Sequence, residues 1–112
     1  MVITINEKLY RARAEVARAI AHPIRLEIID ILHGEEELCV QEITEMVAAS
    51  QSSISKHLGI LKDAGILARR KEGLNSYYQL RTPCLASIFN CLDDILREKL
   101  KRSRSELDLL EG

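Results

Sequence analysis

Aromatic residues and long apolar runs are scarce in this sequence. Its 112 residues include no tryptophan, one phenylalanine and three tyrosines. The longest uninterrupted apolar run spans residues 46–49, whereas a membrane-spanning helix requires roughly twenty apolar residues. The apolar core of a signal peptide and a basic leader at the start are also missing. These absences predict a cytosolic protein with no membrane partner.

Cysteine is infrequent as well. The three cysteines, Cys39, Cys84 and Cys91, are an odd number, which argues against a disulfide framework and favours free thiols in a reducing compartment. Two prolines and five glycines form no linker, and the chain has no internal repeat. The composition is therefore that of one ordinary globular domain.

No charge sign dominates, because the net charge is −1. The distribution is uneven, however: residues 50–81 hold six basic and two acidic side chains, whereas residues 35–45 hold five glutamates and no lysine or arginine. A locally basic segment allows a small domain to bind a phosphate backbone. The chain has no glycine-rich phosphate loop, nucleophile–base set or paired metal-ligand spacing, so we do not expect an enzyme.

Apolar periodicity predicts four helices in the first part of the chain. Asn6 is a good N-cap for the first, Pro23 suits the first turn of the second and Gly34 ends it, and Ser50 is a strong N-cap for the fourth. The expected helices cover residues 6–22, 23–34, 40–47 and 50–65. The third and fourth lie so close in sequence that a sharp turn must join them.

The pattern changes after Gly65. Residues 66–71 and 76–80 read as two strands on either side of a turn at residues 72–75. Pro83 then opens a long helix, and its apolar face between residues 85 and 100 is too broad for a domain of this size to cover alone. A second copy of the chain is the natural cover, so we expect a homodimer.

The predicted fold is mainly α with one β-hairpin. About five helices in the order α-α-α-α-β-β-α form a winged helix-turn-helix, expected to be dimeric. We expect a single domain over residues 1–112, with residues 1–5 as an N-terminal tail and residues 101–112 as a charged C-terminal extension.

Polar residues at the start of the fourth helix and basic residues on the hairpin predict DNA binding. Hydroxyls and an amide at a helix N-terminus donate hydrogen bonds to phosphates and base edges, and the helix dipole favours the anion. The expected DNA contacts are Ser50, Gln51, Ser52, Ser53, Ser55, Lys56 and His57 on the helix and Arg69, Arg70, Lys71 and Asn75 on the hairpin. For His57, packing or hydrogen bonding on the helix is the alternative. A winged-helix module that binds only proteins is the rival function, but it gives no reason for the basic hairpin.

Several consecutive motifs resemble the ArsR/SmtB family of transcriptional repressors. The matching stretches are AHPIRL (residues 21–26), ELCVQEI (37–43), SQSSISKHL (50–58), LKDAGIL (61–67), RRKEG (69–73) and YYQL (77–80). The resemblance implies a homodimer that pairs through its first and last helices. It also implies a repressor that binds an imperfect inverted repeat in double-stranded operator DNA and is released by an effector.

The resemblance is less informative about the effector. Arsenic- and cadmium-sensing members carry a Cys-Val-Cys pair where this chain has Cys39-Val40-Gln41, and one thiol cannot hold a soft ion alone. The positions that match the zinc ligands of other members are Thr82, Cys84, Ile95 and Glu98, and isoleucine cannot ligate. We therefore do not expect a zinc site of that kind.

Three roles stay open for Cys39, Cys84 and Cys91. They are thiolate ligands for arsenite or another soft metal ion, a redox or persulfide switch, or small residues without a sensing role. Cys84 and Cys91 are seven residues apart in sequence, about 10 Å along a helix. A shared ion therefore needs a further thiol from elsewhere in the dimer.

Overall fold

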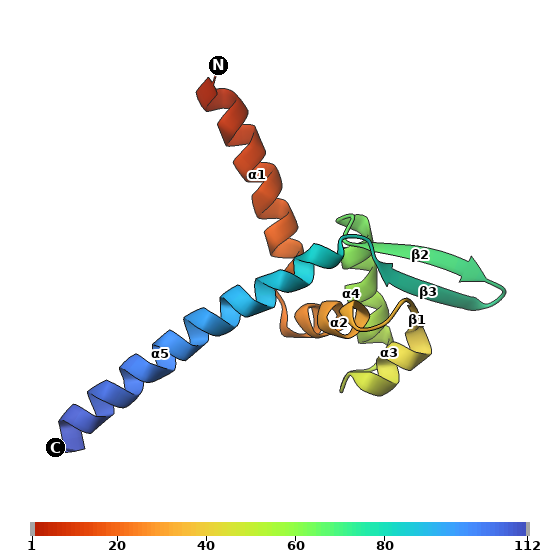
Figure 1. Cartoon of the computed structure of the whole chain (residues 1–112). Helices are drawn as coiled ribbons and strands as arrows, with labels where there is room; N and C mark the ends of the chain where they lie inside the picture. The colour runs from red at the N-terminus through yellow and green to blue at the C-terminus, as the bar shows by residue number, and fades with distance from the viewer. Residues whose placement is uncertain (1, 112) are drawn as a thin grey trace.

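The computed structural model describes the backbone of residues 2–111 and the side chains of residues 6–111. The helices are α1 (Val2–Ile20), α2 (Pro23–His33), α3 (Val40–Met46), α4 (Gln51–Asp63), the short 3-10 helix η1 (Pro83–Ser87) and α5 (Ile88–Glu111). The strands are β1 (Leu38–Cys39), β2 (Leu67–Glu72) and β3 (Asn75–Leu80). The elements α2, α3, α4 and the sheet form a small body from which α1 and α5 extend in different directions (Figure 1). The predicted mainly α architecture with one β-hairpin is confirmed for the single chain.

The core lies between α2, α4 and the base of the sheet. Each helix contributes the residues that recur on one face at helical spacing. Fully buried side chains are Ile28, Ile29 and Leu32 of α2, Ile43 of α3, Ile54, Leu58 and Leu61 of α4, and Leu67 of β2. The apolar stripe of α4 therefore points inward, which leaves the opposite face of this helix for a partner.

Two side-chain caps fix the starts of α2 and α4. His22 precedes Pro23, and its Nδ1 accepts a hydrogen bond from the Ile24 N–H at 3.1 Å. Ser50 Oγ accepts from the Ser53 N–H at 3.2 Å, as predicted for an N-cap. Only residues 47–50 separate α3 from α4, which confirms the sharp turn between them.

The sheet has three antiparallel strands in the order β1-β3-β2. The β2–β3 hairpin, called the wing below, was predicted, and its turn is the dipeptide Gly73-Leu74 between the paired residues Glu72 and Asn75. Gly73 has φ +62° and no described non-glycine residue has positive φ, as in a type II′ turn with glycine at its first position. The edge strand β1 was not predicted, because two residues carry no periodicity.

The predicted N-terminal tail needs correction, and the predicted charged C-terminal extension is helical. Helix α1 begins at Val2, before the expected cap Asn6, so residues 2–5 are not a tail; residue 1 lies outside the described residues. No glycine or proline interrupts residues 2–20, so the helix propagates to the end. Residues 101–111 likewise continue α5, where Arg102 and Glu106 have the i, i+4 spacing that supports a helix.

The apolar faces of α1 and α5 are largely uncovered. Helix α5 has no buried residue within the chain, and Ile95, Leu96 and Leu100 are all more than half exposed. Leu9 and Val16 on α1 are exposed as well. None of the described helices is long and apolar enough to cross a membrane.

Candidate nucleic-acid interface

The start of α4 presents a polar face to solvent. Gln51, Ser52, Ser55 and Lys56 are exposed, whereas Ile54, Leu58 and Leu61 on the other side of the helix are buried. We call these four exposed residues the polar face of α4. The side chain of Ser50 is also exposed, and its Oγ lies 3.2 Å from Ser52 Oγ. Hydroxyl, amide and ammonium groups are thus gathered at the positive end of a helix dipole.

Not every predicted contact on α4 is available. His57 is only 8% exposed and stacks on His22, with the ring centres 4.3 Å apart. Burial, followed by the nearby charges of His22, Arg25 and Lys56, lowers the pKa of His57. A side chain this buried has no face left for a base or a phosphate. We therefore correct the prediction and assign His57 to packing.

The basic residues of the wing point to two different faces of the sheet. Arg69 pairs with Tyr78 and Lys71 with Ser76 across the hairpin, while Arg70 pairs with Tyr77. Since successive strand residues alternate between faces, Arg69 and Lys71 share the face of the buried Tyr78. That face carries the core and packs against the helices. Arg70 projects from the other face.

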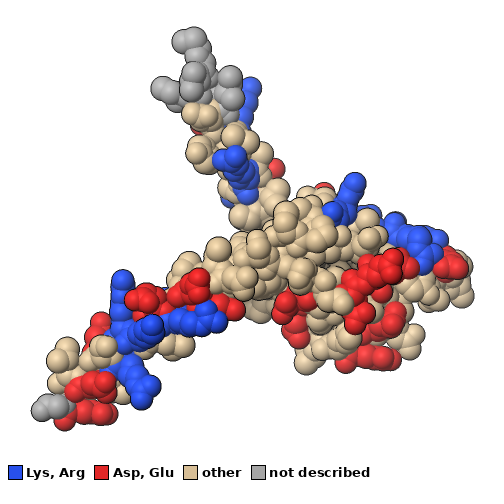
Figure 2. All heavy atoms as spheres, viewed as in Figure 1, with Lys and Arg blue, Asp and Glu red and all other residues tan. Residues whose placement is uncertain are grey.

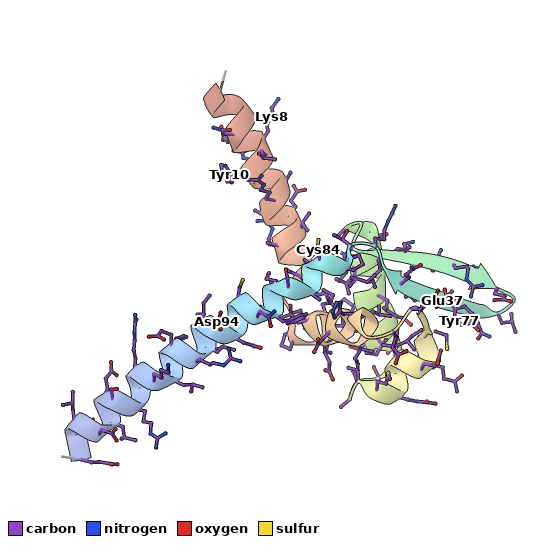
Figure 3. The ribbon with its side chains drawn as sticks, viewed as in Figure 1. Lys8, Tyr10, Glu37, Tyr77, Cys84 and Asp94 are labelled. Carbon is purple, nitrogen blue, oxygen red and sulfur yellow. The ribbon has the colours of Figure 1, made fainter. Side chains whose placement is uncertain are left out.

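Arg70 is held by two carboxylates and an aromatic ring. Its Nη2 donates to Glu37 Oε1 at 2.5 Å and its Nη1 to Glu72 Oε2 at 2.6 Å. Its guanidinium carbon lies 4.7 Å from the centre of the Tyr77 ring. The hydrogen bonds that Arg70 donates to Glu37 and then to Glu72 raise the pKa of Arg70, and the contact with Glu37 lowers the pKa of that carboxyl group. Glu37 and Tyr77 are labelled together beside the sheet in Figure 3.

This cluster corrects the role expected for Arg70. The ion pair with Glu37 links the wing to the segment just before β1, 33 residues earlier in the chain. Arg70 therefore ties the two together instead of lying free beside a phosphate. No local sequence pattern predicts this pairing, because the carboxylate comes from a distant segment. Among the described residues, neither Arg69 nor Lys71 forms an ion pair with a carboxylate.

The wing tip and the start of α4 border a common hollow. Its volume is about 190 Å³, and its lining includes Gln51 and Ser55 from α4 and Leu74, Asn75 and Ser76 from the wing. Asn75, one of the expected DNA contacts, thus lies near the polar face of α4. Basic side chains lie along the hairpin, and acidic ones gather over the lower part of the body (Figure 2).

The cysteines occupy separate places. Cys39 is half-buried beside the wing and lines the hollow just described. Cys84 and Cys91 are exposed and line a groove of about 620 Å³ between α1, the end of α4 and α5. Figure 3 labels Cys84, which lies in η1. Among the described residues, no cluster of three or more His, Cys, Asp or Glu side chains is placed to hold a metal ion.

A tight pair of helices followed by a basic antiparallel hairpin defines a winged helix-turn-helix protein. The sequence profile described as "Bacterial regulatory protein, arsR family" matches residues 22–69. An HTH-type transcriptional regulator of Methanocaldococcus jannaschii is 35% identical over 86 residues, which are 77% of this chain and 97% of that protein. The transcriptional repressor PagR of Bacillus anthracis is 33% identical over 73% of this chain and 82% of its own length.

Solved structures agree with the sequence comparison. The crystal structure of Rv0081 from Mycobacterium tuberculosis superposes with a TM-score of 0.70 at 30% identity, covering 85% of this chain and 95% of that one. The chain belongs to the arsR family of bacterial regulatory proteins. It is a DNA-binding transcriptional regulator and not an enzyme.

Proposed function

We propose that the protein is a repressor that binds an imperfect inverted repeat as a homodimer. The observation that carries the proposal is the polar face of α4, which the packing of Ile54, Leu58 and Leu61 turns outward beside the wing. Each subunit lays the start of α4 into a major groove, since this groove admits a helix and shows a distinct pattern for each base pair.

The contacts of each subunit divide into two groups. Base edges are read by Gln51, Ser52 and Ser55, because an exposed amide and hydroxyls combine donors and acceptors. Phosphates are bound mainly by charged side chains, which carry affinity without sequence information. The proposed phosphate-binding set is Ser50, Ser53, Lys56, Arg69 and Lys71, and Asn75 contacts the DNA from the wing.

The uncovered helices support the homodimer. Leu96 and Leu100 on α5 are 54% and 69% exposed, and Leu9 and Val16 on α1 are each 43% exposed. Burial of such residues is favourable by about 25 cal/mol per Å² of apolar surface. We propose that α1 and α5 pair with the same helices of a second subunit, which sets the spacing of the two α4 helices.

The salt dependence of DNA binding tests the proposal. A 30-bp duplex selected from a random library by the wild-type protein serves as the specific probe, and a scrambled duplex as the non-specific one. We expect affinity for both to fall by orders of magnitude between 50 and 200 mM salt. Gln51→Ala should weaken the selected duplex only. Affinity that does not change with salt would contradict the proposal.

We further propose that an effector acts through thiols, with arsenite or another soft metal ion as the first candidate. Cys84 and Cys91 support this, because both are exposed in a groove bordered by α1 and α5. A partner copy at these helices brings a second set of thiols, and arsenite takes about three thiolates. A persulfide or other oxidant acting on the same thiols is the alternative.

A titration of the reduced protein on its selected duplex separates these effectors. Arsenite, cadmium, zinc and a persulfide are added in parallel while DNA release is followed by fluorescence anisotropy. Release by arsenite that Cys84→Ser or Cys91→Ser abolishes supports the thiolate site. Release by persulfide alone supports the redox alternative. No release by any of the four, with DNA binding intact, would leave the cysteines without a sensing role.

A further inference from the structure

Leu74 is the most exposed large apolar side chain of the described residues. Its exposed fraction is 105%, compared with 82% and 85% for Leu109 and Leu110 near the end of α5. The two-residue turn consists of Gly73 and Leu74, and Leu74 occupies its second position. A hairpin turn of this kind needs glycine at its first position but makes no demand for an apolar residue at the second. Neither packing nor turn geometry therefore explains the leucine.

The position of Leu74 relates it to the polar face of α4. Leu74 and Asn75 line the same hollow as Gln51 and Ser55, and the hairpin projects away from the body at this end (Figure 1). When α4 occupies a major groove, as the proposed function requires, the wing tip extends past the intervening phosphates. Arg69 and Lys71 lie behind the tip on β2, where they meet this backbone.

We propose that Leu74 enters the minor groove beside each half-site and selects base pairs that lack the guanine 2-amino group. This inference rests on the proposed function. The minor groove shows acceptors at every base pair, and the guanine N2 amino group is its only donor. An apolar side chain packed against that amino group leaves a buried donor without a partner, which is costly. A·T pairs carry no such group.

The neighbouring residue completes the selection. Asn75 follows Leu74 and is exposed, so its side-chain amide is free to donate to adenine N3 or thymine O2. Leucine is also among the residues that proteins insert as apolar wedges into the minor groove. Because Leu74 has no charge, its contribution to affinity is independent of counterion release.

Repeating the random-library selection with Leu74→Ser tests this inference. We expect the wild type to enrich A·T pairs at symmetric positions outside the two half-sites, and L74S to lose this enrichment while it keeps the half-sites. Leu109→Ser is the matched control, because it removes another exposed leucine at the far end of α5. Since Leu74 is fully exposed, we expect the thermal unfolding of L74S to match the wild type.

Inosine identifies the chemical group that is read. An I·C pair has the major-groove groups of G·C but lacks the 2-amino group. At the flanking positions we expect the wild type to bind A·T and I·C duplexes alike and the G·C duplex about tenfold more weakly, the size of effect typical of a buried unpaired donor. For L74S the three duplexes should bind within about twofold, with an unchanged salt slope.

The outcomes separate this inference from the proposed function. If the wild type binds its selected duplex but I·C behaves like G·C, or L74S discriminates as the wild type does, the minor-groove role of Leu74 is wrong and the repressor proposal stands. If the wild type binds no duplex with salt-dependent affinity, both are wrong.

Discussion

Neighbouring basic side chains on one strand of the wing have different roles. Arg69 and Lys71 lie on the face that carries the core, whereas Arg70 projects from the other face and is held by Glu37 and Glu72. Alternation along a strand separates them even though they are adjacent in sequence. The sequence predicted one basic patch, and the strand pairing divides it: Arg70 is held in ion pairs, and Arg69 and Lys71 are the residues proposed to contact DNA.

Arg69→Ala and Arg70→Ala should differ in the salt dependence of DNA binding. Each lost phosphate contact lowers the slope of log affinity against log salt by about 0.9, so R69A should lower it by about 2 for a dimer. R70A should leave the slope unchanged, because its charge is already paired with Glu37. Anisotropy titrations from 50 to 300 mM salt measure both. A reduced slope for R70A would place this side chain on a phosphate.

His57 should make the protein less stable in mild acid. Its pKa is lowered in the folded state, first by burial, so the unfolded chain binds the proton more tightly. The stabilisation is therefore complete above the ordinary histidine pKa of about 6.5 and is lost as the pH falls from that value to the lower pKa of the folded state. Thermal unfolding at pH 7.5 and pH 5.5 measures the loss. His57→Gln should show a smaller fall, and an equal fall would assign the effect to other groups.

Among the secondary structure elements, the long helices and the wing were predictable, and the short strand was not. Apolar spacing, Pro23 in the first turn of α2 and the N-cap Ser50 located α2 and α4, because these signals are local. The two residues of β1 pair with Tyr77 and Tyr78, far along the chain. Likewise, Glu37 contacts Arg70 from the segment just before β1, which is distant in sequence. Tertiary contacts of this kind produce no periodic pattern in the amino-acid sequence.

Substitutions of Ser50 test how much the cap stabilises the start of α4. Ser50→Ala removes the hydrogen bond to the Ser53 N–H and should lower the free energy of unfolding by about 1 kcal/mol. Ser50→Asn keeps a capping side chain and should restore most of this stability. Urea unfolding measures both variants. Equal stability of S50A and the wild type would show that the cap does not hold the helix start.

Charge substitutions in the outer part of α5 test the proposed dimer interface. Leu100 lies on the same face as Leu96, whereas Leu109 lies on the opposite side of the helix, given 3.6 residues per turn. Leu100→Glu should shift the protein to monomer in analytical ultracentrifugation, because it places a charge in an apolar interface. Leu109→Glu is the matched control and should remain dimeric. A dimer that tolerates L100E would need a different interface.

At the scale of the whole molecule, the proposed function depends on the distance between two copies of α4 in the proposed homodimer. One chain has a small body and two long helices, with overall extents of 64 × 48 × 22 Å. The body carries the polar face and the wing, and the long helices carry uncovered apolar residues (Figure 1). In the proposed homodimer, α1 and α5 therefore determine how far apart the two recognition surfaces lie.

Hydroxyl-radical footprinting of the selected duplex tests this arrangement most directly. A dimer that places one α4 in each of two major grooves on one side of the duplex should protect two symmetric patches, about one helical turn or a small multiple of it apart. Leu100→Glu should abolish the paired footprint at the same subunit concentration. A single unsymmetric patch, or an identical footprint from the monomeric variant, would contradict the account.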